Sequence, residues 1–399
     1  MLIKNTLFFK VFFYAQALDK TGKRQFDKTE DSYIILAMKK PAFISISFAV
    51  LLIVSFAYTL CFPVQLITRP VYKADSVIST ESDMEITYPD AYFVEDDIIA
   101  YFSIKNESVT FIEDLSILND EYEKNYIAGN INGYVKYNKS GTLLQFFSPN
   151  GALLSEQRSS GCYPYIIDDS PVVYAIKDGG QTLRSFYFNG EPLLQDYIDN
   201  SLICSVSMSE NFDTAISYAD GDSLLLNKSG EVIFSCEQKE SEIKIAKASC
   251  YSADSKFFCE ISGLFPEILT IYNVDTKAKI AQFKTGSNFR YAPLMKIYND
   301  VVYYETENAL ELYFINNGEK SSLQFNGELI DFKVNTQNEI ILLSEKDSMN
   351  YLYIYNSEGV RSFYQESYNS ISNLRVYDSE TFYFKFDKEI YVLRRKMLS

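Results

Sequence analysis

Residues 350–366 read NYLYIYNSEGVRSFYQE, and this stretch decides the fold. Its tyrosines alternate with Leu352 and Ile354, which is the two-residue period of a β-strand. Residues 356–359, NSEG, are typical of a tight turn in which Gly359 takes a positive φ. Residues 360–365 again suit a strand. The stretch therefore predicts a β-hairpin.

The same hairpin recurs along the chain. The upstream copies are LLQFFSPNGALLSEQ, LRSFYFNGEPLLQDY, SLLLNKSGEVIFSCE, LTIYNVDTKAKIAQF and LELYFINNGEKSSLQF. The six turns centre on Gly151, Gly190, Gly230, Thr276, Gly318 and Gly359, with spacings of 39, 40, 46, 42 and 41 residues. A period near 40 that is built only of strands is typical of a β-propeller, with one four-stranded blade per repeat. The predicted fold is therefore all-β.

Strand patterns place the propeller at residues 83–399. The first blade is a short one, with strands at 91–95, 98–104, 108–112 and 115–118. The last part of the chain offers only three strands, at 374–377, 382–386 and 390–393. Because an unpaired sheet edge invites unwanted pairing, we expect residues 83–88 to supply the missing outer strand and close the ring. This count gives eight blades, or seven if the weak first blade is irregular.

Composition narrows the possible functions. The chain has no histidine, which excludes Ser-His-Asp and Cys-His catalysis and every metal or haem site that needs an imidazole ligand. The net charge is −16; residues 1–40 carry +4, so the remainder carries −20. Such an acidic domain is expected to repel nucleic acid, although the charge also serves solubility. No phosphate-binding glycine motif is present, so we expect no nucleotide cofactor.

The N-terminal region predicts a membrane anchor. Residues 42–64, AFISISFAVLLIVSFAYTLCFPV, contain no charge and are long enough to cross a bilayer as a helix. Within the helical segment 41–64, Pro41 suits the start and Pro63 the end. Lys39 and Lys40 come directly before it, so the positive-inside rule places the N-terminus in the cytoplasm and the propeller on the extracytoplasmic side.

Several alternatives remain open at this end of the chain. Residues 1–40 are either a cytoplasmic tail or an over-extended start, in which case translation begins at Met38 and MKK opens a targeting sequence. Residues 55–57 would suit cleavage, which would release the domain as a secreted or periplasmic protein. Cys61 suggests lipidation less well, because Leu60 stands where a small residue is needed. Residues 65–82 are expected to be a linker.

Cys250 and Cys259 flank a predicted tight turn at residues 254–255, which would place them directly opposite each other on neighbouring strands. Cross-strand Cβ atoms are about 4.5–5.5 Å apart, whereas a disulfide favours about 3.8 Å. A strained disulfide between the two competes with the simpler interpretation that both are buried small apolar residues.

Acidic pairs mark three predicted turns: 95–97, 168–169 and 220–222. Calcium needs six or more converging oxygens, and Asp and Gly are common in turns for backbone reasons alone. We therefore expect no metal site, no catalytic residue and no cofactor.

The repeat length, the turn after each third strand and the ring closure together resemble β-propellers of the WD40-like and quinoprotein-like superfamily. Over residues 83–396, this resemblance implies a binding or assembly platform rather than an enzyme. The sequence thus predicts a membrane-tethered, extracytoplasmic, non-enzymatic platform for a protein partner. The alternatives are a receptor domain for a small ligand or sugar, and an enzyme that uses carboxylates. Acidic, tyrosine-bearing loops at 121–123, 168–169, 237–242 and 366–368 would favour a basic partner.

Overall fold

The computed structural model describes residues 70–79, 91–95, 98–103, 108–114, 125–237, 240–386 and 389–397. All of them lie in one compact unit, Thr68–Ser399. Every regular element of this described part is a β-strand, which confirms the all-β prediction. No helix found there is long and apolar enough to cross a bilayer. The predicted tail 1–40 and membrane helix 41–64 fall outside the described residues.

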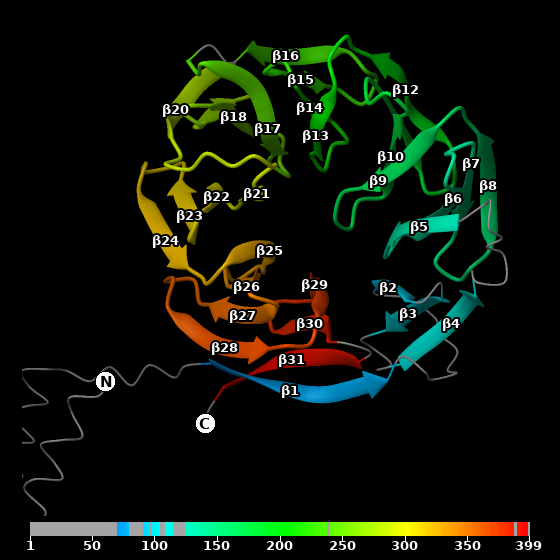
Figure 1. Ribbon diagram of the computed structural model, residues 1–399, viewed down its shortest axis with the longest axis vertical. Coiled ribbons are helices and arrows are strands. Elements are labelled where there is room, and N and C mark those ends of the chain that lie inside the picture. The colour runs from blue at the N-terminus through cyan, green and yellow to red at the C-terminus, as the bar shows by residue number, and fades with distance from the viewer. Residues whose placement is uncertain are drawn as a thin grey trace, which may run out of the picture. The chain divides into compact units, whose positions relative to one another are not determined.

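The described strands form eight antiparallel sheets, which follow one another around a ring (Figure 1). The first three sheets are β2 (Ala91–Glu95), β3 (Ile98–Ser103) and β4 (Ser108–Asp114); β5 (Asn125–Asn130), β6 (Gly133–Asn138), β7 (Leu143–Phe147) and β8 (Leu153–Arg158); and β9 (Cys162–Ile166), β10 (Val172–Lys177), β11 (Thr182–Tyr187) and β12 (Pro192–Ile198). The next two are β13 (Ile203–Met208), β14 (Thr214–Tyr218), β15 (Asp222–Leu226) and β16 (Val232–Glu237); and β17 (Ile243–Tyr251), β18 (Phe257–Leu264), β19 (Ile268–Asn273) and β20 (Ala278–Lys284). The last three are β21 (Met295–Tyr298), β22 (Val301–Thr306), β23 (Ala309–Phe314) and β24 (Lys320–Gln324); β25 (Glu328–Val334), β26 (Ile340–Lys346), β27 (Met349–Tyr355) and β28 (Arg361–Ser367); and β29 (Ile371–Val376), β30 (Thr381–Phe386) and β31 (Glu389–Met397) with β1 (Pro70–Ser79).

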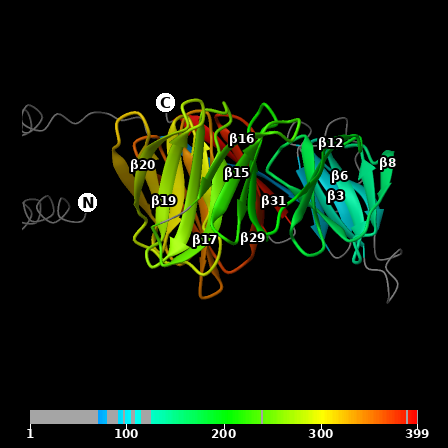
Figure 2. The ribbon, with the colours of Figure 1, turned by 90° about the horizontal axis from the view of Figure 1, so that it is seen from above.

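This topology gives the ring two faces, seen from the side in Figure 2. In seven sheets the first strand lies innermost and the last described strand outermost; in the eighth, β29 lies innermost and β1 outermost (Figure 1). Since neighbouring strands are antiparallel, the loops that join first to second and third to fourth strands share one face, called here the hairpin face. The loops that join second to third strands, and each sheet to the next, share the opposite, connection face.

Five of the six repeated turns contain a glycine with positive φ; in the sixth, at Thr276, Lys277 takes a φ of 55°. Gly359 has a φ of 74°, and its N–H donates to the carbonyl of Asn356 at 2.9 Å. Gly190 has a φ of 80° and lies so close to the neighbouring sheet that a Cβ would come within 2.5 Å of Ser155. Glycine is therefore needed both for the left-handed backbone and for close approach between blades.

The core lies between neighbouring sheets. All five residues of β14 are buried, and the central strands β22 and β26 also begin with five buried residues each. Aromatic rings bridge adjacent blades, such as those of Tyr303 and Phe332, whose centroids are 6.0 Å apart. Tyrosine and phenylalanine supply large apolar area at these contacts, which accounts for their high content in the sequence.

The two ends of the described chain close the ring, but with a different strand from the one predicted. β1 pairs along its length with β31, from Pro70 opposite Met397 to Ser79 opposite Glu389 (Figure 1). The prediction that residues 83–88 supply this strand was therefore wrong, and the segment expected as a linker, 65–82, contains the strand. A register shift between Ala74 and Ser76 interrupts the two-residue alternation, so the sequence pattern did not reveal it. Residues 83–88 and 115–118 fall outside the described residues.

Candidate functional site: the central channel and its mouth

Five of the innermost strands line an open cavity of about 830 Å³. Residues from β9, β13, β17, β21 and β25 line it, together with residues of the loops that follow β9, β13 and β17 and of the loop that precedes β21. The lining includes apolar side chains such as Met208 and Phe212 beside the half-exposed Tyr165. A concave site of this size with mixed walls is suited to a small ligand.

One loop, residues 167–171 between β9 and β10, lies at the mouth of this channel on the hairpin face. The neighbouring β5–β6 hairpin holds it in place. Asn130, which is buried, donates from its amide to the carbonyls of Asp168 at 2.9 Å and Ser170 at 2.7 Å. Asn132 likewise donates to the carbonyl of Asp169 at 2.8 Å. Hydrogen bonds from the neighbouring sheet therefore fix the backbone of this loop.

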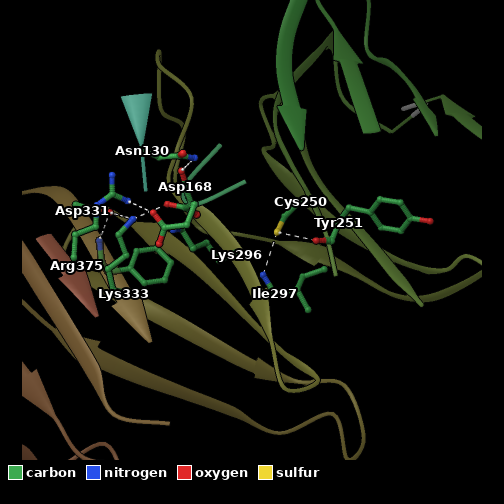
Figure 3. A network of polar contacts seen from close by, with 11 residues as sticks. Asn130, Asp168, Cys250, Tyr251, Lys296, Ile297, Asp331, Lys333 and Arg375 are labelled. Atoms are coloured by element: carbon green, nitrogen blue, oxygen red, sulfur yellow. Dashed lines mark hydrogen bonds and ion pairs between the residues drawn. The ribbon is translucent and has the colours of Figure 1, made fainter. Parts of the chain in front are cut away.

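The side chain of Asp168 forms ion pairs with two residues that are far away in the sequence. Its Oδ2 lies 2.8 Å from Lys296 Nζ on β21, and its Oδ1 lies 2.7 Å from Lys333 Nζ on β25. Figure 3 shows the carboxylate pointing at both amines. Lys333 also lies 3.5 Å from the carboxylate of Asp331. The loop thus connects sheets on different parts of the ring through charge-assisted hydrogen bonds.

A third base completes the cluster. Arg375 on β29 lies 3.6 Å from Asp169, a longer contact than those of Asp168. The two loop aspartates and the three bases line a second cavity of about 270 Å³, whose remaining walls are largely aliphatic. The mouth therefore combines three positive and three negative side chains, all of which except Asp331 line this second cavity.

The charges of this cluster depend on one another. Burial alone would raise the pKa of Asp168, but Lys296 and Lys333 outweigh it and hold that pKa well below its ordinary value. Burial and repulsion from Lys296 lower the pKa of Lys333. The two amines repel each other, and the carboxylate of Asp168, which contacts both, is the anion that neutralises them in this structure.

The three bases were not predicted from the sequence, although a signal for them exists. Each is the middle residue of an apolar–basic–aliphatic triplet in the first strand of its sheet. The triplets are Met295-Lys296-Ile297, Phe332-Lys333-Val334 and Leu374-Arg375-Val376. Because they occupy equivalent places in three successive sheets, the ring brings them to the same mouth. Aligning the repeats by their first strands would have revealed the pattern.

Cys250 and Cys259 are cross-strand partners on β17 and β18, as the turn at 254–255 predicted. Both thiols are free and buried, and no disulfide joins them. Cys250 Sγ accepts a hydrogen bond from the backbone N–H of Ile297 at 3.0 Å, and burial raises its pKa to about 12. At neutral pH this thiol is therefore a packing group rather than a nucleophile.

The acidic turns have different fates. Asp168 and Asp169 lie in the ion-pair cluster, whereas Asp220 accepts from the backbone N–H of Asp222 at 3.2 Å across a simple turn. Residues 96–97 fall outside the described part. Within that part, no three His, Cys, Asp or Glu side chains are grouped closely enough to hold a metal ion.

The fold defines the class of protein, and the comparisons agree with it. A family model described as "beta-propeller protein" matches residues 35–396, so the chain belongs to this family of β-propeller proteins. The search of curated proteins found no match. The predicted resemblance to β-propellers is thereby confirmed at the level of architecture.

Solved structures share this architecture at low sequence identity. BamB from Moraxella catarrhalis is 14% identical with a TM-score of 0.54, over 81% of this chain and 100% of that one. The computationally designed Ika8 protein is 12% identical with a TM-score of 0.56, over 79% of this chain and 98% of that one. At such identity the likeness concerns the fold alone.

Proposed function

We propose that the chain is an eight-bladed, non-enzymatic protein-binding or assembly platform. In this proposal residues 42–64 tether it to a membrane and the propeller lies on the extracytoplasmic side. The family membership and the sequence of the anchor segment support it. The strands of a propeller are committed to pairing and packing, so binding is left to the loops.

The observation that carries the proposal is the set of large apolar side chains exposed in loops and at strand ends on the connection face. They are Ile198 (68% exposed), Leu202 (52%), Ile243 (50%), Phe265 (60%), Tyr291 (44%) and Tyr368 (79%). Tyrosine and phenylalanine are enriched at interfaces because they bring large contact area at low entropic cost. This face is therefore our candidate docking surface.

Phe265 is the best anchor on it. Its backbone has a φ of 56°, a left-handed conformation that is unusual for a bulky residue and often marks a functional position. Two contacts fix the loop: Asn288 Oδ1 accepts from the Phe265 N–H at 3.2 Å, and Ser241 Oγ donates to the Pro266 carbonyl at 2.7 Å. An aromatic ring presented on a fixed backbone loses little freedom on binding.

The same face carries two of the acidic loops predicted to recognise a basic partner. Glu237 ends β16 and the described residues 240–242 precede β17, while residues 366–368 end β28 and begin the next connection. Glu237 and Glu240 have side-chain exposures of 43% and 58%. Glu237 pairs with Lys244 at 2.7 Å and Glu240 lies 3.9 Å from Lys279, so both carboxylates are paired yet exposed, whereas Asp168 and Asp169 lie on the hairpin face. We therefore assign partner recognition to the connection face, with a partner that offers basic groups.

The test is recovery of the partner from native membranes by the full-length protein. Phe265→Asp combined with Tyr368→Asp is expected to reduce recovery at least about tenfold, since charges replace two anchors of the kind that often contribute 2 kcal/mol or more. Val360→Asp is the matched control, because Val360 is 42% exposed in a turn of the hairpin face. Equal recovery by the double variant and the wild type would refute the assignment.

A second function is favoured by the channel itself. Its cavity of about 830 Å³ falls in the range of roughly 300–1,000 Å³ typical of small-molecule sites. A receptor for a small ligand on the hairpin face is compatible with a protein partner on the connection face.

A further inference from the structure

The hairpin-face mouth of the channel gathers three basic side chains in an acidic protein, and Asp168, Asp169 and Asp331 neutralise them. The chain carries −16 overall, yet three successive first strands each place a base here: Lys296, Lys333 and Arg375. They line the 270 Å³ cavity, which adjoins the larger one through Asp168, Lys296 and Lys333. A repeated basic position at the mouth of a cavity points to an anionic ligand.

The carboxylate of Asp168 now lies between Lys296 and Lys333, and its geometry indicates which anion fits there. Asp168 places one carboxylate oxygen on Lys296 at 2.8 Å and the other on Lys333 at 2.7 Å (Figure 3). A flat carboxylate with two oxygens thus bridges the two amines. We propose that the mouth binds a small organic carboxylate, whose carboxylate group replaces that of Asp168 between Lys296 and Lys333. This inference rests on the receptor function proposed above and names its ligand class.

The cluster is open enough to exchange its carboxylate. The Asp168 side chain is 48% exposed and that of Lys296 is 31% exposed, so both are accessible to solvent. The loop is anchored through the backbone carbonyls of Asp168, Asp169 and Ser170, which leaves the Asp168 side chain able to rotate away. The Lys247–Glu267 pair, by contrast, is closed to solvent, with side chains 5% and 0% exposed.

The neighbouring groups would hold the rest of the ligand. Arg375 is 3.6 Å from Asp169 and is placed to contact a second acidic or polar group. Aliphatic walls from Ile297, Val334 and Val376 would pack against a short carbon skeleton. The carboxylate of Asp331, 3.5 Å from Lys333, would repel any further negative charge of the ligand on its side of the mouth. These contacts favour a ligand with one or two carboxylates.

The experiment measures calorimetric binding of succinate and glucuronate to the full-length protein in detergent. Their neutral counterparts, succinamide and glucose, and inorganic phosphate serve as comparison ligands. Because Asp168 competes for the site, the wild type is expected to bind the carboxylates weakly. Asp168→Asn should raise their affinity at least about tenfold, the gain expected if Asp168 fills the site nine-tenths of the time. Lys333→Met should abolish binding in either background.

Asp196→Asn is the matched control, since Asp196 pairs with Lys177 at 2.5 Å on an outer strand and should leave affinity unchanged. If Asp168→Asn does not fold, Asp169→Asn should give a smaller gain. Unchanged or weaker carboxylate binding in the folded Asp168→Asn variant would overturn the proposal, as would no binding to any variant. Equal binding of glucose and glucuronate would also overturn the proposal but would preserve the receptor function. Tighter binding of phosphate than of either carboxylate would overturn it as well, since the ligand class would then be a phosphate.

Discussion

At the scale of single residues, buried charge organises the connection face. Lys247 on β17 lies 2.5 Å from Glu267, and both side chains are buried. Glu267 also accepts from the hydroxyl of Thr285 at 2.7 Å and from the backbone N–H of Phe289 at 3.2 Å. The ring of Phe289 in turn packs against Tyr291, with centroids 4.8 Å apart. One carboxylate thus fixes the loop that presents Tyr291.

Lys247→Met is expected to destabilise the propeller by about 3–5 kcal/mol, because it leaves the buried Glu267 carboxylate without its charge partner. Urea unfolding followed by tyrosine fluorescence measures the change. Lys244→Met is the control on the same strand. Lys244 pairs with Glu237 at 2.7 Å, but the side chains are 44% and 43% exposed, so the loss should be far smaller. A similar loss in the two variants would contradict the role assigned to burial.

At the scale of elements, the sequence predicted the repeated hairpins well and the ring closure poorly. Strands such as β27 and their turns follow from alternation and from Gly359, which are local properties. β1 was missed because a bulge near Asp75 breaks its alternation and because its partner, β31, lies more than three hundred residues away. The cluster at Asp168 was likewise missed, since its partners are 128 and 165 residues distant and only the closed ring brings them together.

Replacing Pro70–Ser79 by a Gly/Ser segment of equal length should lower the thermal midpoint by several degrees. The change removes the outer strand of the last sheet and exposes the edge of β31. A Gly-rich segment also has low β-propensity, so it should not substitute for the strand. Circular dichroism on heating, with the unaltered full chain as reference, measures the effect. An unchanged midpoint would show that closure by β1 contributes nothing to stability.

At the scale of the whole molecule, the two faces of the propeller have different character. The hairpin face holds a mutually neutralised cluster of three bases and three carboxylates at the channel mouth. The connection face exposes Phe265 and Tyr368 among acidic loops, and the hairpin face also exposes apolar side chains, such as Leu153, Val232 and Tyr377. The sequence indicated an acidic, tyrosine-bearing surface, but it could not assign loops to faces. That assignment needs the strand order, which places 168–169 on one side and 237–242 and 366–368 on the other.

Site-specific photo-crosslinking in native cells tests the central claim most directly. A photoreactive residue replaces Phe265 on the connection face in one variant and Val360 on the hairpin face in another; the two positions are 60% and 42% exposed. The account predicts a discrete protein adduct from position 265 that weakens as salt is raised, because screening reduces attraction to an acidic face. Adducts from position 360 alone, or none from position 265, would contradict a protein-binding platform on this face.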